Sequence, residues 1–245
     1  MTRSRDLDIP GRALAVGAHA DDVEFGCGAT LAKWSAAGTH CELLVLTDGS
    51  KGSWDPTADT TALVETREGE QRAAAAALGV ANVRFAGFVD GELEPTRAGR
   101  ERVCAAIRDA RPDVVLGHDP WKRYRLHPDH RVAGELLIGG VVAARDPHFF
   151  SGLGTPHRPR SMLLFEAEDV DHLESVDDRA AEAKVAALLA HHSQWRSTMG
   201  IDPSAPDNER ERQRKAFAER VLDELEEGGD THARLAERFK RIDDL

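Results

Sequence analysis

Two short clusters of histidine and aspartate residues have the composition of a reactive site. The first contains His19, Asp21 and Asp22, which directly follow the apolar run 13–17. The second is the segment His127-Pro128-Asp129-His130, more than a hundred residues later. Imidazole nitrogens and carboxylate oxygens bind zinc, and the same groups transfer protons near neutral pH. The clusters therefore predict metal-assisted or acid–base chemistry if the fold brings them together.

The first cluster lies between a predicted strand and a predicted helix. One aspartate at a helix start is normally an N-cap, because its carboxylate accepts backbone N–H bonds and complements the helix dipole. Here Asp21 and Asp22 are adjacent and His19 is close by. Two carboxylates at the end of a buried strand repel each other unless a cation or a proton intervenes. Ligands of open α/β sheets bind at the carboxyl ends of strands, so we expect a cation here.

The second cluster complements the first. His127 and His130 share one face if the turn that contains them is helical. A catalytic zinc site takes three protein ligands and keeps a fourth position open for water. His19, Asp22 and His130 would supply two imidazoles and one carboxylate. Asp21 and His127 would then remain for proton transfer and charge stabilisation.

Short apolar runs alternate with segments of helical periodicity along most of the chain. This alternation predicts an α/β fold, Rossmann-like, with a mainly parallel sheet flanked by helices. Strands are expected at 14–18, 41–46, 83–86, 113–116, 162–166 and 171–176, and helices at 29–37, 66–78, 99–110, 131–144 and 179–191. We expect a single domain, 1–245, in which about 200–245 forms a charged, helical C-terminal appendage with one or two amphipathic helices beyond 207.

Composition narrows the classes of partner and compartment. The 32 basic and 43 acidic residues give a formal charge of −11, which disfavours nucleic acids and anionic membranes. The three cysteines form no C-x-x-C pair, as expected in a reducing compartment. The N-terminal residues lack the apolar core of a signal peptide, and the apolar stretch 136–144 is too short to span a bilayer. We expect a cytoplasmic protein without membrane insertion, and a homo-oligomer is left open.

Several segments resemble the PIG-L/LmbE family of zinc-dependent N-deacetylases. They are AHADDVEFGCGATLAKW, LTDGSKG, TREGEQRAAAAALGV, FVDG, DPWKRYRLHPDHRVAG and KVAALLAHHSQW, in this order across roughly 14–195. The resemblance implies one Zn²⁺ per chain, held by His19, Asp22 and His130. Since this ligand set also suits other divalent ions, another metal is an alternative.

The same resemblance implies the remaining roles. Asp21 is the implied general base. His127 would stabilise the oxyanion or protonate the leaving amine, and Asp129 would orient His127 and favour its imidazolium form. Arg67 is the implied contact to substrate hydroxyls. No role is assigned to His118.

Two positions depart from the commoner family pattern. Ala20 and Val23 stand where proline and glutamate are usual, and this A-D-D-V variant resembles the bacillithiol-pathway branch. Neither position has a metal ligand in this assignment, so the departures bear on substrate rather than on chemistry.

The resulting hypothesis is hydrolysis of an N-acetyl or other short acyl group on an amino sugar, such as N-acetylglucosamine, or on a glycoconjugate. Bound zinc would lower the pKa of its water towards ~7, and Asp21 would take the proton. One alternative substrate is a thiol conjugate or an acylated natural product. A Rossmann-like nucleotide binder is the alternative from another class, but the fingerprint Gly-x-Gly-x-x-Gly is absent and the carboxylates would repel a pyrophosphate.

Overall fold

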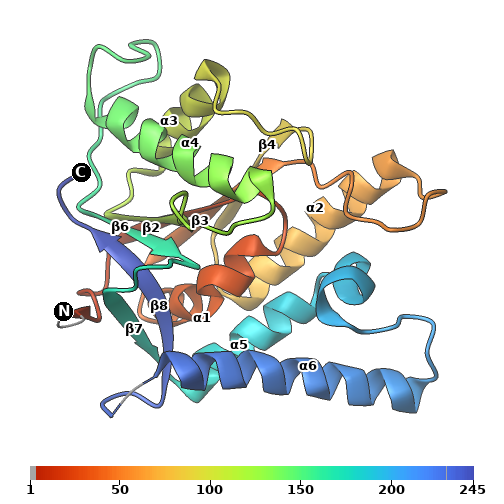
Figure 1. Cartoon of the computed structure of the whole chain (residues 1–245). Coiled ribbons are helices and arrows are strands. Elements are labelled where there is room, and N and C mark those ends of the chain that lie inside the picture. Colours follow the sequence, from red (N-terminus) through yellow and green to blue (C-terminus); the bar gives the residue numbers. More distant parts are fainter. Residues whose placement is uncertain (1–3, 230) are drawn as a thin grey trace.

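A sheet of eight strands organises the structure, a computed structural model that describes residues 4–229 and 231–245 (Figure 1). Its strands are β1 (Ser4–Arg5), β2 (Arg12–Gly17), β3 (His40–Thr47), β4 (Asn82–Phe88), β5 (Val114–His118), β6 (Ser161–Phe165), β7 (His172–Val176) and β8 (Leu235–Ile242). Their order is β1-β7-β8-β6-β5-β2-β3-β4. Strands β2 to β6 pair in parallel, whereas β8 is antiparallel to β6 and β7. The sheet is therefore mainly parallel, as predicted.

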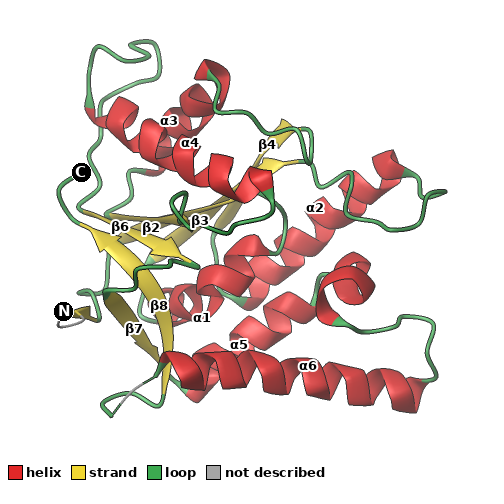
Figure 2. Ribbon diagram, in the orientation of Figure 1, coloured by secondary structure: helices red, strands yellow, loops and turns green. Residues whose placement is uncertain are grey.

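Helices cover both faces of this sheet (Figure 2). They are α1 (Asp22–Ala36), α2 (Thr60–Ala77), α3 (Arg97–Ala110), α4 (Pro128–Arg145), α5 (Asp178–Leu189) and α6 (Asp207–Gly228), with a 3-10 turn at His192–Gln194 and a π turn at Trp195–Met199. Helices α3 and α4 lie on one side, and α1, α2, α5 and α6 lie on the other (Figure 1). The predicted Rossmann-like α/β class and its helical C-terminal part are confirmed. Within the described residues, no helix is both long and apolar enough to cross a membrane.

The two faces of β2 belong to different cores. Leu14 and Val16 pack in the cluster that contains α3 and α4, whereas Ala13 and Ala15 pack in the cluster that contains α1. Successive side chains of a strand point to opposite faces, so a continuous apolar run fits a strand buried on both sides. This burial fixes the end of β2 rigidly, and the first reactive cluster follows immediately.

Helix α1 starts at Asp22, seven residues earlier than predicted, and a kink divides it into two helical segments. Cys27 has φ −152° and ψ 22°, which interrupts the helical path. Beside the kink, a Cβ on Gly26 would collide with the ring of Phe165 on β6. Glycine is therefore required at this close approach of α1 to the sheet. Gly26 and Gly28 near the kink interrupt the helical pattern of the sequence, so that pattern did not predict the first turn of the helix.

Helix α2 also starts earlier than predicted, at Thr60 rather than near residue 66. Asp59 is its N-cap and accepts hydrogen bonds from the backbone N–H groups of Thr61 and Ala62. The expected position of Arg67 at a helix start is thus wrong: Arg67 lies two turns into the helix. There it is almost fully buried.

The C-terminal segment is helical only in part. Helix α6 is the expected amphipathic helix, but residues 235–242 form strand β8, in a segment that was expected to be helical throughout and to contain one or two such helices. This strand lies between β6 and β7 in the sheet, and its residues Leu235, Ala236 and Phe239 are buried. The charged residues of β8 gave it the composition of a solvated helix, and only its place inside the sheet explains why it is extended.

Strand β8 also supplies a hydrogen-bond acceptor to backbone amides of helix α1. The Glu237 carboxylate on β8 accepts hydrogen bonds from the backbone N–H groups of Ala29 (3.1 Å) and Thr30 (2.8 Å). The kink at Cys27 frees these amides, since each helical segment begins with N–H groups that lack an intrahelical partner. Lys184 on α5 donates to the same carboxylate at 2.7 Å. Glu237 thus connects β8 to α1 through backbone hydrogen bonds and to α5 through a buried ion pair with Lys184.

Substitution of Glu237 with glutamine should destabilise the fold. Lys184 and Glu237 are each 4% exposed, so the change leaves a buried ammonium without its counter-charge. Loss of one partner of a buried pair costs roughly 3–5 kcal/mol. Urea denaturation of Glu237→Gln measures this, with Glu219→Gln on the exposed face of α6 as the control. A loss below about 1 kcal/mol would contradict the assigned role.

Glu42 on β3 makes stability depend on pH. It accepts hydrogen bonds from Arg84 (2.8 and 3.0 Å) and Asn82 (3.1 Å). Burial raises the pKa of Glu42. The hydrogen bonds and the Arg84 charge lower this pKa by a larger amount, so the net shift is downward. A carboxylate with a lowered folded-state pKa stabilises the protein above the unfolded-state pKa of about 4.3.

We therefore expect Glu42→Gln to lose about 1–3 kcal/mol near neutral pH. The difference from the parent should shrink as the pH falls below about 4, because the parent then protonates Glu42 as well. Thermal denaturation across this pH range measures both effects. Glu68→Gln, in an exposed pair with Arg72, should change stability by less than about 0.5 kcal/mol. A difference that stays constant down to low pH would refute the assignment.

Candidate metal centre and active-site cavity

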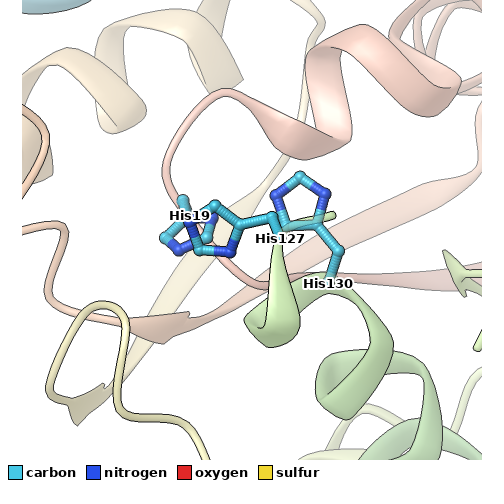
Figure 3. A group of neighbouring side chains, drawn as sticks. All are labelled: His19, His127 and His130. Atoms are coloured by element: carbon cyan, nitrogen blue, oxygen red, sulfur yellow. The ribbon is translucent and has the colours of Figure 1, made fainter. Parts of the chain in front are cut away.

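The two reactive clusters meet at the carboxyl ends of neighbouring parallel strands. His19 follows β2, and His118 is the last residue of the adjacent strand β5. His127 immediately precedes α4, and His130 lies in its first turn. Figure 3 shows the imidazoles of His19, His127 and His130 gathered between the turn after β2 and the start of α4. Their ring centroids are 4.6 to 5.2 Å apart.

The turn before α1 is strained. Asp21 has φ +94°, in the left-handed region that non-glycine residues rarely occupy. Its backbone N–H donates to Oε1 of Gln71 at 3.1 Å, and Arg67 donates to the neighbouring Ala20 carbonyl at 2.7 Å. Two side chains of α2 therefore hold this turn. Asp21 and Asp22 both line one cavity.

The Asp22 carboxylate is the centre of the cluster. Its Oδ1 lies 3.2 Å from Nε2 of His130, and its Oδ2 lies 3.3 Å from Nδ1 of His19. Oδ2 is also 3.1 Å from Nε2 of His118 and accepts the His19 backbone N–H at 2.7 Å. Burial raises the pKa of Asp22, but His118 and His130 lower it more strongly, so it lies well below its usual value. Asp22 is therefore ionised.

His19 faces three carboxylates. Its Nε2 lies 3.1 Å from Asp129 and 3.0 Å from Asp90, while Nδ1 faces Asp22. Burial lowers the pKa of His19, but hydrogen bonds with Asp129, Asp22 and Asp90 raise it to about 12. Metal-binding histidines typically donate their second ring N–H to a carboxylate, which fixes the tautomer. His19 has this arrangement through Nε2. Because its pKa is about 12, the ring without a metal also holds a proton on Nδ1, which a cation bound there would displace.

Two of the three predicted ligand pairs have a spacing compatible with a shared zinc ion, although they use different oxygens of Asp22. Ligands about 2.0–2.1 Å from a tetrahedral zinc lie about 3.3 Å from one another. The measured separations from Asp22 are 3.3 Å to His19 and 3.2 Å to His130. Among the described residues, three groups have possible ligand atoms within 4.8 Å of one another: Asp22 with His118 and His130, His19 with His127 and His130, and His19 with Asp90 and Asp129. The predicted ligands His19, Asp22 and His130 are spread over these groups and do not form one of them. These imidazole and carboxylate donors nonetheless fit a divalent metal.

Asp129 is placed differently from its expected role. Its carboxylate contacts His19 and accepts the backbone N–H groups of Gly91 (2.7 Å) and Leu93 (3.2 Å) in the loop after β4. Among the described contacts, it makes no hydrogen bond to His127. Burial and the nearby His19 charge lower the pKa of His127, and Asp129 offsets this only in part. The expected imidazolium form of His127 is thus not favoured in this structure.

Sequence reasoning missed His118 and Asp90. His118 is almost fully buried and its Nδ1 lies 3.1 Å from Glu166, so it bridges Glu166 and Asp22. Both residues sit at or just after the carboxyl end of a strand, the signal that identified the first cluster. The same rule, applied to each predicted strand, would have found them.

A buried polar layer supports Asp21 from behind. The Gln71 amide donates to Glu24 at 2.5 Å, and Glu24 lies 3.7 Å from His191. Glu24 and His191 are both fully buried. Burial raises the pKa of Asp21, Arg67 lowers it and Asp22 raises it, with a net value of about 6. A carboxylate of this kind can take up a proton near neutral pH.

A cavity of about 600 Å³ opens over these groups. Its lining combines the proposed ligands with polar residues from other loops: Lys51, Arg67, Asp90, Glu166, Gln194 and Thr198. The basic loop 121–125 lies beside it and is anchored to the segment after β6. Arg125 pairs with Glu166, and the Arg123 backbone N–H donates to Glu168 at 2.8 Å. This volume suits a small polar molecule.

Comparison with known proteins agrees with this geometry. Residues 14–139 match PIG-L, the family of GlcNAc-PI de-N-acetylases. The chain belongs to the PIG-L family. The match spans both clusters, from β2 into α4.

Individual relatives are deacetylases. The chain is 34% identical to the diacetylchitobiose deacetylase of Thermococcus kodakarensis, over 75% of this chain and 70% of that protein. It is 35% identical to the 1D-myo-inositol 2-acetamido-2-deoxy-alpha-D-glucopyranoside deacetylase of Kineococcus radiotolerans, over 56% of this chain and 46% of that protein. The solved N,N'-diacetylchitobiose deacetylase of Pyrococcus horikoshii superposes with a TM-score of 0.80 at 26% identity, over 96% of this chain and 84% of that chain.

The metal set can be tested by direct binding. We expect the purified chain to bind about one equivalent of Zn²⁺, as a three-ligand site does. His19→Ala, Asp22→Ala and His130→Ala should each abolish stoichiometric binding, measured by elemental analysis and titration. Each removes one of the three predicted ligand groups.

Two further variants make the test specific. His148→Ala, an exposed histidine elsewhere, should bind zinc like the parent. His118→Ala should keep the metal if His118 only supports Asp22. Loss of zinc in His118→Ala together with retention in His130→Ala would show that the third ligand is His118.

Proposed function

We propose that this protein is a zinc-dependent N-deacetylase that releases acetate from an N-acetylated amino sugar or glycoconjugate. The observation that carries this proposal is the position of Asp21, which lines the same cavity as Asp22 and the histidines His19, His127 and His130. A hydrolytic metal site needs both a cation and an adjacent proton acceptor. The relatives from Thermococcus and Kineococcus are both named for deacetylation of acetamido sugars, which supports the substrate class.

The cavity provides groups that recognise a sugar. Arg67, Lys51 and Asp90 line it beside the cluster, so they can hydrogen-bond to ring hydroxyls. The Arg67 guanidinium already donates to the carbonyls of Ala20 (2.7 Å) and Gly49 (3.2 Å), which fixes its position. Its Nε is buried without a protein partner. Arg67 is therefore our candidate for a contact to substrate.

The carboxylates at the end of β2 also weigh against nucleotide binding. A dinucleotide places its pyrophosphate against the first turn after the first strand of a Rossmann fold. In this chain that turn holds the buried residues Asp21 and Asp22. Their charge would repel a phosphate but attracts a divalent cation.

Each residue has a defined task in hydrolysis. A zinc ion held by His19, Asp22 and His130 would polarise the acetamide carbonyl and acidify water. Asp21 accepts a proton from the attacking water, whose oxygen forms the new bond to the acyl carbon. Asp129 and Asp90 hold the Nε2 side of His19, so that Nδ1 would be the atom that binds the metal after it loses its proton.

The leaving group needs a proton when the C–N bond breaks. His127 lies at the exposed side of the cluster, 4.6 Å in ring centroid distance from His19. There it can relay to the leaving nitrogen the proton that Asp21 took from water and, while protonated, stabilise the oxyanion. The proton that Asp21 accepted balances the reaction, and the products are acetate and a free amine. Glu24, Gln71 and His191 keep Asp21 in its strained position.

The proposal is tested with the zinc-loaded chain and a panel of N-acetylated sugars that includes N-acetylglucosamine and N,N'-diacetylchitobiose. Amine release is measured with an amine-reactive dye. We expect Asp21→Asn to lower kcat by about 10²–10⁴-fold with KM and zinc content little changed, because only proton transfer is lost. His127→Ala should lower kcat as well.

Asp223→Asn, an exposed aspartate on α6, serves as the matched control and should keep full activity. The proposal fails if the zinc-loaded parent releases no amine from any sugar of the panel. It also fails if Asp21→Asn retains most of the parental kcat.

A further inference from the structure

A chain of contacts leads from the loop between β5 and α4 to the Asp22 carboxylate, and the mechanism above does not use it. Its first member is Arg125 in that loop, which pairs with Glu166 directly after β6. Oε2 of Glu166 lies 3.1 Å from Nδ1 of His118. At the other nitrogen of the same ring, Nε2 lies 3.1 Å from Oδ2 of Asp22. Glu166 is therefore connected through one buried histidine to a predicted metal ligand.

The His118 ring is tightly packed. It is almost fully buried at the end of β5. It stacks on the His130 ring, with centroids 4.4 Å apart and planes at 27°. The Phe165 ring contacts it at 4.6 Å and 67°. This packing leaves the ring little freedom to turn, so the partner at Nδ1 determines how Nε2 meets Asp22.

The partner at Nδ1 also decides which ring nitrogen carries the hydrogen. Nη2 of Arg125 lies 3.3 Å from Nδ1, and a guanidinium has only donors. In the neutral ring Nδ1 then accepts, and Nε2 donates its hydrogen to Asp22. A nitrogen that donates has no lone pair for a metal, so His118 supports Asp22 and is not a ligand. Glu166 keeps Arg125 at this place.

The backbone of Glu166 is strained. Its φ is +55°, in the left-handed region that glycine favours. A residue with a side chain persists there only when its surroundings hold it, at a cost in stability, and such residues cluster at functional sites. Here the cost falls on a residue whose carboxylate reaches both Arg125 and the His118 ring.

A second arginine–glutamate pair joins the same two segments but lies at the surface. Arg123 is 3.8 Å from Glu168, and both side chains are exposed, whereas Arg125 is mostly buried. Either pair can anchor the loop to the segment after β6. Among the described contacts of the two pairs, those with His118 belong to Arg125 and Glu166. Loop anchoring alone therefore does not account for the inner pair.

We propose that Glu166 is a positioning residue for the metal centre: it holds Arg125 against His118, and His118 then directs the Asp22 carboxylate towards the cation. This inference rests on the metal site of the proposed function and adds a residue that lies beyond the family match at 14–139. Loss of a partner that orients a ligand typically weakens metal binding 10–100-fold. Glu166 takes no part in the chemical step.

The test measures the zinc dissociation constant of the full chain by competition with a chelator. Glu166→Gln should bind one equivalent of zinc about 10–100-fold more weakly than the parent. Glu168→Gln is the matched control, because it removes the same charge from the outer pair, and it should stay within about twofold of the parent. Glu166→Gly removes the strain together with the carboxylate and should show the same loss, so it replaces Glu166→Gln if that variant does not fold. Parental affinity in a folded Glu166 variant overturns the proposal.

Two further measurements test the route through His118. In a His118→Ala background, adding Glu166→Gln should weaken zinc binding by less than about twofold, because the contact through which Glu166 acts is already absent. Losses that multiply in the double variant overturn this route. The visible absorption of the Co²⁺-loaded protein reports ligand geometry, and it should change in Glu166→Gln but not in Glu168→Gln. An unchanged spectrum in Glu166→Gln overturns the positioning role.

These outcomes are separate from those of the deacetylase proposal. A parent that binds zinc but releases no amine refutes deacetylation and leaves the role of Glu166 in place. Parental zinc affinity in Glu166→Gln refutes that role and leaves deacetylation in place. A parent that binds no divalent metal refutes both.

Discussion

The buried carboxylate of Asp22 is the constraint on which the site depends. It is ionised, and imidazole nitrogens of His19, His118 and His130 surround it within 3.3 Å. A buried charge is stable only when it is paired and hydrogen-bonded. The elements that bring these histidines to Asp22 are the ends of β2 and β5 and the start of α4. Their common location at one edge of a parallel sheet makes the cluster a consequence of the fold.

Strain at the neighbouring turn is held in place by packing far from the cavity. Asp21 keeps its left-handed backbone because α2 supplies Gln71 and Arg67. Helix α1 can approach the sheet only because residue 26 is glycine, and its kink is satisfied by Glu237 from the last strand. The C-terminal strand therefore contributes to the site indirectly, through the orientation of the helix that begins with Asp22. A rigid support of this kind suits a reaction that depends on the position of one carboxylate.

The reactive end and the recognition end of the cavity are built differently. The proposed metal ligands and proton-transfer groups lie at strand ends and helix starts, where burial fixes their positions. The outer walls are formed by the loop with Gly52 and the segment with Gln194. Trp54 and Arg196, on the same loop and segment, line a neighbouring cavity. Loops on a rigid scaffold can vary without loss of the fold, so they commonly determine which ligand binds.

The sequence by itself predicted the alternation of strands and helices from β2 to α6 and the residue types of the first and second clusters, because strand and helix periods and local residue chemistry are readable in short windows. It also led to the expectation that His19, Asp22 and His130 meet, since parallel strands end at one edge. Only the tertiary structure decided that His118 shares Asp22, that Asp129 holds His19 rather than His127, and that 235–242 is a strand. Each of these depends on contacts between segments distant in the chain, where local patterns are uninformative and packing selects the partner.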